Sequence, residues 1–391
     1  MDVAELRELL SPGGLRLLDE VGPIASTQDV VRTVSRLRAA GHSGSLVAAV
    51  LGQARLRAKA QPKFGDFASR MLFTPDGLEQ ATRLRVAAVH AGRFDEAGVD
   101  VVADLGCGIG ADAMAFAALD LGVLAVERDE LTAAVAAFNL APFPSARVEI
   151  GDAENTDLAA VGGVWLDPAR RAAGRRLDDP ADWSPHLDWA FRIAEDRPTG
   201  IKLGPGLDRD LIPSGCEAQW VSVDRDVVEL VLWFGELARP GIGRAALVLS
   251  DAGSAELTAI ADSPDADAGP LGEYLLEPDG AVIRARLIGD LARGIGGRMI
   301  DPTIAWITCD SAPQSPFGQA FRVLERFPLD VKTLKRELGS RDIGTLEIKK
   351  RGVDIDPATF RHRLDLRGSG SATLILTRVG GDRVALLAER V

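Results

Sequence analysis

A carboxylate and three closely spaced glycines are the residues whose types and spacing most directly suggest chemistry: Asp104, Gly106, Gly108 and Gly110. They follow a valine-rich run at 99–103 and precede an alanine-rich, helical stretch at 111–119. Because glycine has no Cβ, such a turn can adopt positive φ and lie against a ligand, while the next helix presents free N–H groups. This pattern of strand, glycine turn and helix predicts a site for a nucleotide-like cofactor.

Two further carboxylates follow the next two expected strands. The strand at 122–126 ends at Glu127, about 20 residues after the turn, where doubly wound folds place an acid that accepts hydrogen bonds from ribose hydroxyls. A third strand at 147–150 is followed by Asp152. A single acid after a strand is usually a turn or cap residue, but acids at the ends of three successive strands favour a shared site. We therefore predict that Glu127 binds a ribose.

The glycine spacing distinguishes between two classes of cofactor. A dinucleotide fingerprint reads G-x-G-x-x-G, whereas here the third glycine comes one residue earlier and Asp104 stands two residues before the first. Asp-x-Gly-x-Gly-x-Gly at the end of a first strand resembles motif I of class I S-adenosylmethionine (AdoMet) methyltransferases. The resemblance implies that the turn holds the methionine half of AdoMet and that Asp152 faces the adenine amino group. It implies these cofactor-binding residues: Thr74, Asp104, Gly106, Cys107, Gly108, Gly110, Glu127, Arg128, Asp152 and Ala153.

The tetrapeptide Asp167-Pro168-Ala169-Arg170 follows an expected fourth strand at 161–166. It is similar to the Asn/Asp/Ser-Pro-Pro-aromatic motif of the amino-methylating enzymes in this class. There, the acidic side chain and a proline carbonyl accept the protons of an amine whose lone pair is otherwise conjugated with a ring. Alanine replaces the second proline here, and Arg170, which can stack on a base or pair with phosphate, replaces the aromatic residue. The resemblance implies catalytic roles for Asp167, Pro168 and Arg170.

Two basic residues follow this motif. Arg171 opens a loop rich in arginine, aspartate and proline, and we expect it to contact the substrate. Lys202 lies in a short apolar strand at 200–203. It is either a strand lysine that extends its amine to solvent or a residue of the site.

The segment at 58–94 resembles the one that precedes motif I in trimethylguanosine synthase and its relatives. It has a Lys-Phe-x-x-Phe opening and a Thr-Pro helix start, with threonine as N-cap and proline at the first helical position. The resemblance implies that Lys63, Phe64, Phe73 and Thr74 lie over the active site, the first three as substrate contacts. The alternative is a helix and loop that only cover the edge of the sheet.

Composition excludes several classes of protein. The chain has 391 residues, 46% of them hydrophobic, which is long for one domain. No apolar run approaches the roughly 20 residues of a membrane span, and the N-terminal sequence lacks a signal-like segment, so we expect a cytoplasmic protein without membrane contact. The three cysteines are far apart and without C-x-x-C spacing, which predicts neither a disulfide framework nor a metal site.

Positive charge is concentrated near the C-terminus. The whole chain has a net charge of −12, yet residues 329–391 carry 13 Lys and Arg against 9 Asp and Glu. This tail belongs to an expected βαβαββ-like unit that begins with a strand near 320–324 and includes the run Lys349-Lys350-Arg351. Together with the core, it resembles a bacterial AdoMet methyltransferase family with a THUMP-like domain. THUMP-type domains are associated with RNA modification, so the resemblance implies that the run contacts phosphates; a solvated basic turn is the alternative.

We therefore expect an α/β protein in four parts. These are a helical N-terminal domain at 1–75, a Rossmann-like, seven-stranded class I AdoMet methyltransferase core at 76–238, a strand-containing connecting region at 239–320 and a small α+β THUMP-like domain at 321–391. The expected activity is methylation of RNA, either tRNA or rRNA, with a base exocyclic amine as the implied acceptor and no metal. The alternatives are an AdoMet- or RNA-binding protein without turnover and a small-molecule methyltransferase.

Overall fold

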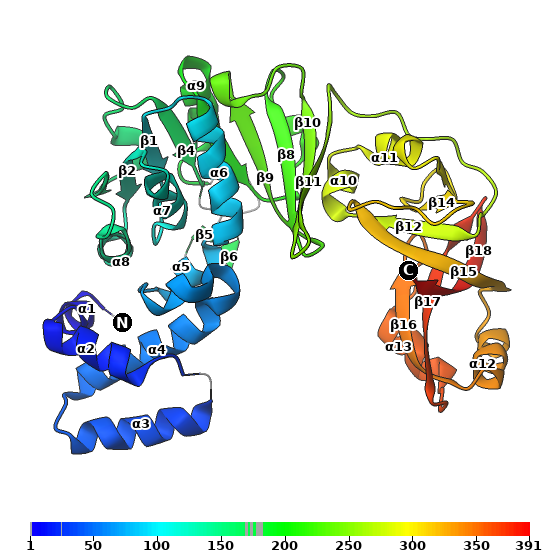
Figure 1. The fold of residues 1–391 in the computed structure, drawn as a ribbon, viewed down its shortest axis with the longest axis horizontal. Helices are drawn as coiled ribbons and strands as arrows, with labels where there is room; N and C mark the ends of the chain where they lie inside the picture. Colours follow the sequence, from blue (N-terminus) through cyan, green and yellow to red (C-terminus); the bar gives the residue numbers. More distant parts are fainter. Residues whose placement is uncertain (1, 25, 169–170, 173–174, 177–182) are drawn as a thin grey trace. The chain divides into compact units, whose positions relative to one another are not determined.

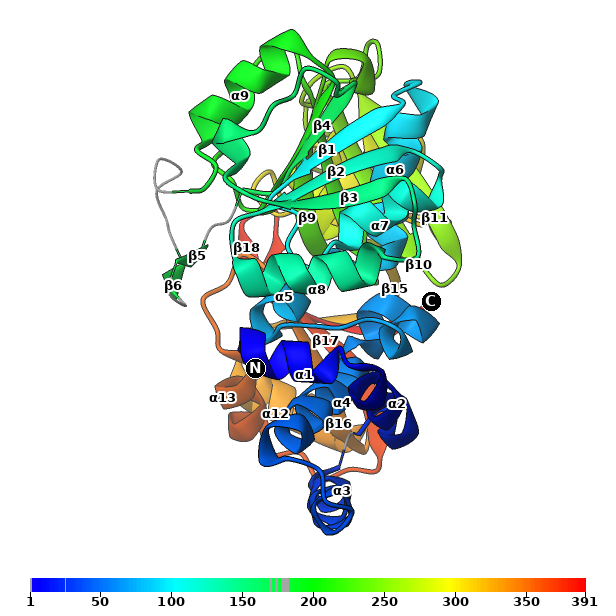
Figure 2. The same cartoon turned by 90° about the vertical axis from the view of Figure 1, so that its left-hand side faces the viewer.

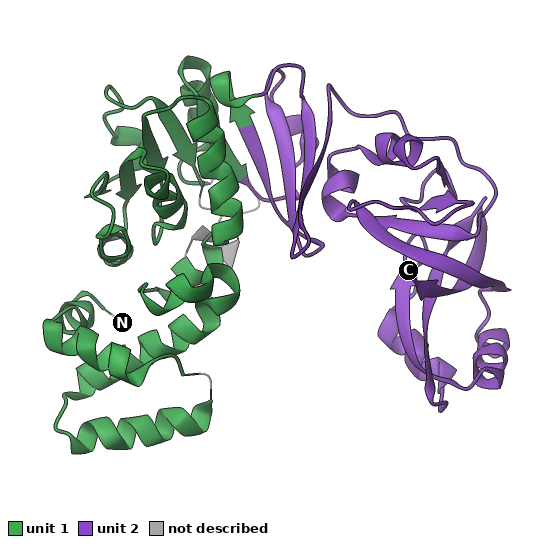
Figure 3. Ribbon diagram, viewed as in Figure 1, with its two compact units in different colours: residues 1–202, 233–238 green, residues 203–232, 239–391 purple. Residues whose placement is uncertain are grey.

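The computed structural model describes residues 2–24, 26–168, 171–172, 175–176 and 183–391 (Figure 1). The chain forms two compact units (Figure 3). One comprises residues 1–202 and 233–238, and the other comprises residues 203–232 and 239–391. None of the helices in the described part of the chain is long and apolar enough to cross a bilayer.

The first unit begins with helices: α1 (Val3–Leu9), α2 (Pro12–Val21), α3 (Thr27–Ala39), α4 (Gly44–Phe64), α5 (Pro75–Gln80) and α6 (Leu84–Glu96), with a 3-10 turn, η1 (Gly65–Ser69), after α4. Side-chain oxygens cap the first five at their N-termini, as Ser43 caps α4 and Thr74 caps α5, because the first N–H groups of a helix have no partner within it. The long helix α4 packs against α1, α2 and α3. Leu6, Leu18 and Val50 are buried there.

Five parallel strands follow: β1 (Val101–Leu105), β2 (Gly122–Glu127), β3 (Ala146–Ile150), β4 (Gly163–Leu166) and β7 (Thr199–Leu203). Their order in the sheet is β3-β2-β1-β4-β7. Figure 2 shows α7 (Ala111–Ala118) and α8 (Glu130–Leu140) on one side of these strands and α9 (Leu187–Asp196) on the other. The chain moves outward from β1 to β3 and then returns to β4 beside β1. Ligands bind at such a switch point, outside the carboxyl ends of the strands.

The same sheet continues through β9 (Asp226–Phe234), β8 (Glu217–Val223), β10 (Arg244–Ser250) and β11 (Gly253–Ala259). Strand β10 pairs with β8 in parallel and with β11 in an antiparallel hairpin. The sheet thus has nine strands, where the sequence predicts seven. The apolar run of β10 indicates a buried strand, but a strand's own sequence does not show which sheet it joins.

A second sheet has the order β13-β14-β12-β15-β18-β17-β16. Its strands are β12 (Tyr274–Pro278), β13 (Arg298–Met299), β14 (Ile307–Cys309), β15 (Gly318–Pro328), β16 (Ile343–Lys350), β17 (Gly370–Val379) and β18 (Asp382–Arg390). Its helices are α10 (Gly280–Arg284), α11 (Ile288–Gly294), α12 (Val331–Ser340) and α13 (Pro357–Leu364). Alternate residues of β17 enter different cores, because successive side chains of a strand face opposite sides. Leu374 packs with Leu334 and Phe360, whereas Ile375 packs with Trp306 and Phe321.

Gly200 on β7 allows two buried indole rings to pack closely against the backbone of this strand. A Cβ at this position would lie 2.7 Å from Trp165 and 2.8 Å from Trp233, and both indoles are fully buried. We predict that Gly200→Ala destabilises the protein by about 1–3 kcal/mol through overpacking. Denaturant unfolding measures this free energy. Gly92→Ala in α6, where a Cβ meets no atom within 4 Å, is the control and should be neutral or stabilising; equal stabilities of the two variants would contradict the packing argument.

Candidate cofactor and acceptor site

The turn between β1 and α7 depends on positive φ at three glycines. The φ angles are +87° at Gly106, +55° at Gly108 and +85° at Gly110, a region that side chains disfavour. The N–H groups of Gly106 and Cys107 donate to the Val126 carbonyl at 2.9 and 3.0 Å, which fastens the turn to β2. A Cβ on Gly108 would meet no atom within 4 Å. Backbone is therefore exposed where a ligand has to approach.

The loop that follows β4 lies against this turn. A Cβ on Gly106 would come within 3.5 Å of the Asp167 carbonyl oxygen. The Asp167 side chain is 34% exposed, and Pro168 behind it is buried. Ala169 and Arg170 lie outside the described residues. Arg171 begins β5 (Arg171–Ala172), which pairs with β6 (Arg175–Arg176), and its substrate role stays a prediction.

Glu127 ends β2 beside the glycine turn. Its Oε2 accepts a hydrogen bond from the Gly108 N–H at 3.1 Å, and its Oε1 accepts one from the Asp129 N–H at 2.9 Å. A carboxylate has about four acceptor sites, so Glu127 can order the turn and still accept bonds from a ligand. Its neighbour Arg128 donates to the Ser184 hydroxyl at 3.0 Å.

Asp152 follows β3, whose last residue, Ile150, pairs with Glu127. Its Oδ1 accepts from the Glu154 N–H at 2.9 Å and so caps the short 3-10 helix η2 (Ala153–Asn155). The side chain is exposed. Asp152 is thus a cap residue by its contacts, and the adenine role that the resemblance implies for it stays a prediction.

Asp104 is the most deeply buried acid at this edge of the sheet, with 1% of its surface exposed. Burial, followed by the negative charges of Asp112 and Asp167, raises the pKa of Asp104 well above 3.8. Its Oδ2 has no hydrogen-bond partner among the described residues. Burial also raises the pKa of the Cys107 thiol, which keeps this cysteine protonated. Among the described residues, no group of three or more His, Cys, Asp or Glu side chains is arranged to hold a metal ion.

Lys202, for which the sequence leaves two interpretations, points into this site. Its Nζ lies 2.5 Å from Asp167 Oδ2 and donates to the Thr82 hydroxyl at 2.9 Å. The lysine side chain is only 11% exposed. A lysine in an apolar strand is the one sequence signal for this contact, and nothing in the sequence pairs it with Thr82.

The aromatic residues of the segment before α5 are core residues. Phe64 and Phe73 are 1% and 0% exposed, and their ring centroids lie 5.5 Å apart. These contacts make Phe64 and Phe73 core residues with little surface to offer a ligand, and the substrate contact that the resemblance implies for them stays a prediction. The Thr74 hydroxyl, also buried, accepts from the Gly77 N–H at 3.0 Å as the cap of α5. The sequence pattern of aromatic residues before a Thr-Pro helix start does not show whether the rings face a ligand or the protein core.

Lys63 holds the end of α5 instead of extending toward an open site. Its Nζ donates to the carbonyl oxygens of Leu78, Glu79 and Ala81 at 2.8, 2.7 and 2.9 Å. Burial, and then the nearby positive charges of Arg83 and Lys202, lower the pKa of Lys63 to about 8. Three carbonyl acceptors match the three donors of an ammonium group, so these contacts give Lys63 a structural role, and its substrate contact stays a prediction.

Two amide side chains that the sequence analysis missed tie the loop before α5 in place. Asn139 of α8 accepts from the Leu72 N–H at 2.8 Å and donates to the carbonyls of Leu72 and Ile109 at 3.0 and 2.9 Å. Gln53 of α4 exchanges two hydrogen bonds with the Phe73 backbone, at 2.7 and 3.0 Å. Asn139 thereby joins this loop to the glycine turn.

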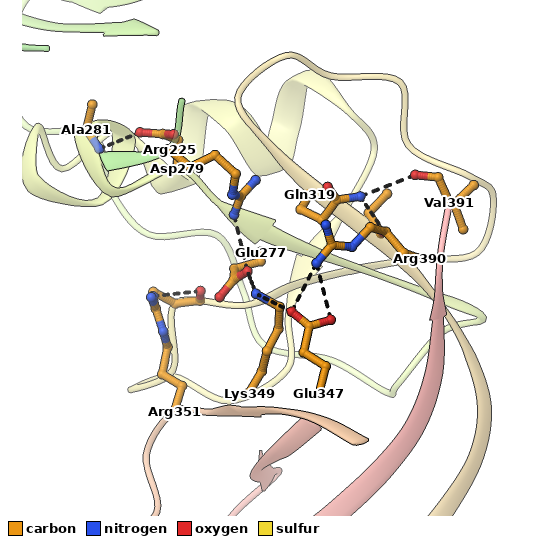
Figure 4. Close-up of polar contacts among 12 residues, drawn as sticks. Arg225, Glu277, Asp279, Ala281, Gln319, Glu347, Lys349, Arg351, Arg390 and Val391 are labelled. Carbon is orange, nitrogen blue, oxygen red and sulfur yellow. Dashed lines mark hydrogen bonds and ion pairs between the residues drawn. The ribbon is translucent and has the colours of Figure 1, made fainter. Parts of the chain in front are cut away.

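The basic run of the C-terminal sheet is not a free cluster. Figure 4 shows Lys349 directed at Glu277, and its Nζ lies 2.7 Å from Glu277 Oε2. Arg351 donates to the Ala305 carbonyl at 3.1 Å. Only Lys350 of the three is exposed, because alternate residues of a strand face opposite sides. Lys349 and Arg351 thus direct donors to partners within the protein, and the three-residue phosphate contact stays a prediction.

The chain belongs to the family of S-adenosylmethionine-dependent methyltransferases. It is 34% identical over 337 residues to a protein from two strains of Mycobacterium tuberculosis that is named an uncharacterized S-adenosylmethionine-dependent methyltransferase, covering 83% of this chain and 91% of the relative. AdoMet is thus the methyl donor of this enzyme. Residues 318–390 match the family described as THUMP domain-like, and residues 2–60 match a domain of unknown function, DUF8688.

A solved structure shares the whole fold. A protein from Porphyromonas gingivalis, crystallised as a candidate methyltransferase, superposes with a TM-score of 0.73 at 20% sequence identity, over 100% of this chain and 99% of the other. The helical N-terminal region, the Rossmann-like core and the C-terminal sheet therefore form an architecture found in a second protein.

The raised pKa of Asp104 gives a prediction about stability and pH. The folded protein keeps a proton on Asp104 in a range where the unfolded chain has lost it, so this residue makes the free energy of unfolding fall as pH rises above about 4. Asp104→Asn removes this titration. We expect the difference in free energy of unfolding, variant minus wild type, to increase as the pH rises from 5 to 8, as measured by urea unfolding. A constant difference would show that Asp104 ionises normally in the folded protein.

Proposed function

We propose that this enzyme methylates RNA, and that Asp167 orients the acceptor, a base exocyclic amine. The observation that carries the substrate class is the match of residues 318–390 to the THUMP domain-like family, because THUMP-type domains are associated with RNA modification. The amine is supported by the similarity of Asp167-Pro168 to the loop of amino-methylating enzymes of this class.

The residues around the glycine turn suit AdoMet, which carries two positive charges and a ribose. The turn is open at Gly108, where a Cβ would meet no atom within 4 Å, and the N-terminus of α7 follows the three glycines. Glu127 retains acceptor capacity for ribose hydroxyls after its two backbone bonds. Asp104 is a buried acid whose Oδ2 has no partner among the described residues, and a cationic ligand nearby would stabilise its ionised form. We assign Asp104 and Glu127 to the cofactor shell on these grounds, and Asp152 on the resemblance to class I methyltransferases alone.

Asp167 is the chain's best-placed residue for the acceptor. Bound AdoMet supplies an electrophilic methyl group with a neutral thioether as the leaving group. Asp167 sits directly beside the glycine turn, and its carboxylate reaches solvent while Lys202 holds one of its oxygens. A carboxylate there can accept a proton-bearing group of the acceptor and fix its lone pair within about 3–3.5 Å of the methyl carbon. The methylated nitrogen then releases its surplus proton to solvent.

A small-molecule acceptor is the second candidate. Residues 1–328 carry a net charge of −16, against +4 for the tail, and an acidic surface repels the phosphates of RNA. Transfer from labelled AdoMet distinguishes the two acceptors. Only methylation of RNA predicts label in an RNA fraction, and ribonuclease treatment should remove that label.

Glu127→Ala tests the ribose assignment. The loss of hydrogen bonds to a charged acceptor costs about 1.5–3 kcal/mol, so we expect AdoMet to bind at least about 10-fold more weakly by calorimetry. Glu149→Ala, which removes an exposed acid of the neighbouring strand β3, is the control and should leave affinity unchanged. An AdoMet affinity in Glu127→Ala equal to that of the wild type would exclude Glu127 from the cofactor shell.

Total RNA from a strain that lacks the gene tests the function. The wild-type enzyme should transfer tritium from AdoMet into this RNA, with the methylated nucleoside identified by mass spectrometry. Asp167→Ala should bind AdoMet normally and lose transfer by about 100-fold or more, since its carboxylate acts on the acceptor as charge develops.

Asp167→Asn separates two roles of this carboxylate. The amide keeps an acceptor oxygen, so partial activity is expected if Asp167 orients the acceptor, whereas a required negative charge or general base predicts none. Transfer at the wild-type rate by Asp167→Ala would contradict the assignment of Asp167 to the acceptor. Label found only in small molecules would contradict RNA as the substrate and favour a small-molecule acceptor.

A further inference from the structure

A buried chain of polar side chains runs from the aromatic core to Asp167. His90 of α6 lies 2.8 Å from Asp112 Oδ1, and the Thr82 hydroxyl lies 2.6 Å from Asp112 Oδ2. Lys202 of β7 then joins Thr82 to Asp167. His90, Asp112 and Thr82 are 0%, 6% and 5% exposed. Asp167, at 34%, is the only member that reaches solvent to a substantial degree.

The hydrogen bonds in this chain have a fixed direction. Burial raises the pKa of Asp112, but the hydrogen bonds from His90 and Thr82 and the charge of Lys202 outweigh it and lower this pKa overall. Asp112 is therefore an ionised carboxylate, which can only accept hydrogen bonds. The Thr82 hydroxyl has one proton to donate, and it donates it to Asp112. The remaining lone pairs of the Thr82 hydroxyl accept from Lys202 Nζ. Lys202 has three N–H donors; it donates to Thr82, and its ammonium also lies against Asp167 Oδ2.

At the buried end of this series of polar side chains, the position of His90 is fixed by packing. The His90 ring lies 4.3 Å from the Trp165 ring, centroid to centroid, and both are fully buried. Trp165 belongs to β4, the strand that leads to Asp167. Burying a polar group costs free energy unless its hydrogen-bond partners are in place. A buried hydrogen-bonded series of this kind therefore favours one geometry over others.

We propose that Thr82 and Lys202 are positioning residues for methyl transfer, which hold the Asp167 carboxylate beside the glycine turn in the orientation that the acceptor requires. The inference rests on the proposed role of Asp167 toward the acceptor. It adds two residues that would not touch acceptor or cofactor and would act on the reaction only through Asp167. Lys202 contacts the carboxylate, and Thr82 directs Lys202.

Thr82→Val removes the hydroxyl and keeps the shape of the side chain. We expect kcat for transfer to total RNA to fall about 10- to 100-fold, because small displacements of a positioning group have effects of this size, while AdoMet affinity stays within about 2-fold. Thr82→Ser, which restores a hydroxyl, should recover most of the activity. Thr377→Val is the matched control, since Thr377 is fully buried and its hydroxyl has no partner among the described residues. Its activity should equal that of the wild type.

A double-mutant cycle distinguishes positioning from general destabilisation. If Thr82 acts through Asp167, Thr82→Val should have no further effect on the residual rate of Asp167→Ala. Equal fold-losses in the two backgrounds would overturn the proposal, as would wild-type kcat in Thr82→Val or a failure of Thr82→Ser to recover activity.

The lysine ammonium signal in NMR gives a readout that needs no acceptor. In protein labelled with ¹⁵N-lysine, the Lys202 signal is assigned by its loss in Lys202→Arg, and it should shift in Asp167→Asn and broaden or vanish in Thr82→Val. Lys349, paired with Glu277, serves as the internal reference. An unchanged Lys202 signal in Thr82→Val overturns the proposal. If the wild-type enzyme fails to label RNA while this signal responds as expected, the RNA assignment fails and the positioning of Asp167 stands.

Discussion

The candidate site depends on a close approach between two backbone segments, the glycine turn after β1 and the loop after β4. Strands β1 and β4 are parallel neighbours, with Leu105 opposite Leu166, so the loops that follow them leave the sheet together. A side chain at position 106 would already touch the Asp167 carbonyl. The turn after β1 and the loop after β4 are thus in contact at one edge of the sheet, and the positive φ of Gly106 is what favours glycine at this position.

Two buried acids near this edge differ because of their partners, not because of burial. Asp112 receives hydrogen bonds from His90 and Thr82 and has a lowered pKa, whereas Asp104 has an oxygen without a partner among the described residues and a raised one. The fold thus fully satisfies one carboxylate and leaves the other to be stabilised by positive charge. In the proposed cofactor site, the positive charge of AdoMet would stabilise the ionised form of Asp104.

The N-terminal helices contribute to the site through the loop that they hold. Gln53 binds the backbone of Phe73, and Arg57 donates to the Met71 carbonyl at 3.0 Å. Asn139 binds the intervening Leu72 and also the Ile109 carbonyl of the glycine turn. Both sets of bonds go to backbone atoms, so they hold the path of this loop in addition to the packing of its buried side chains. The helical region is therefore a support for the cofactor turn.

Local periodicity and turn chemistry made part of this structure predictable from the order of the residues. The valine run before Asp104, the glycine spacing and the Thr-Pro start of α5 each act within a few residues, so the turn, the caps and the α/β class could be predicted. Tertiary structure decided every question of partner and direction. Lys202 meets Asp167 from a different strand, Phe73 faces a core and Lys349 meets Glu277. The physical reason is that a residue type fixes what a side chain can bind, whereas only packing between distant segments fixes what lies within its reach.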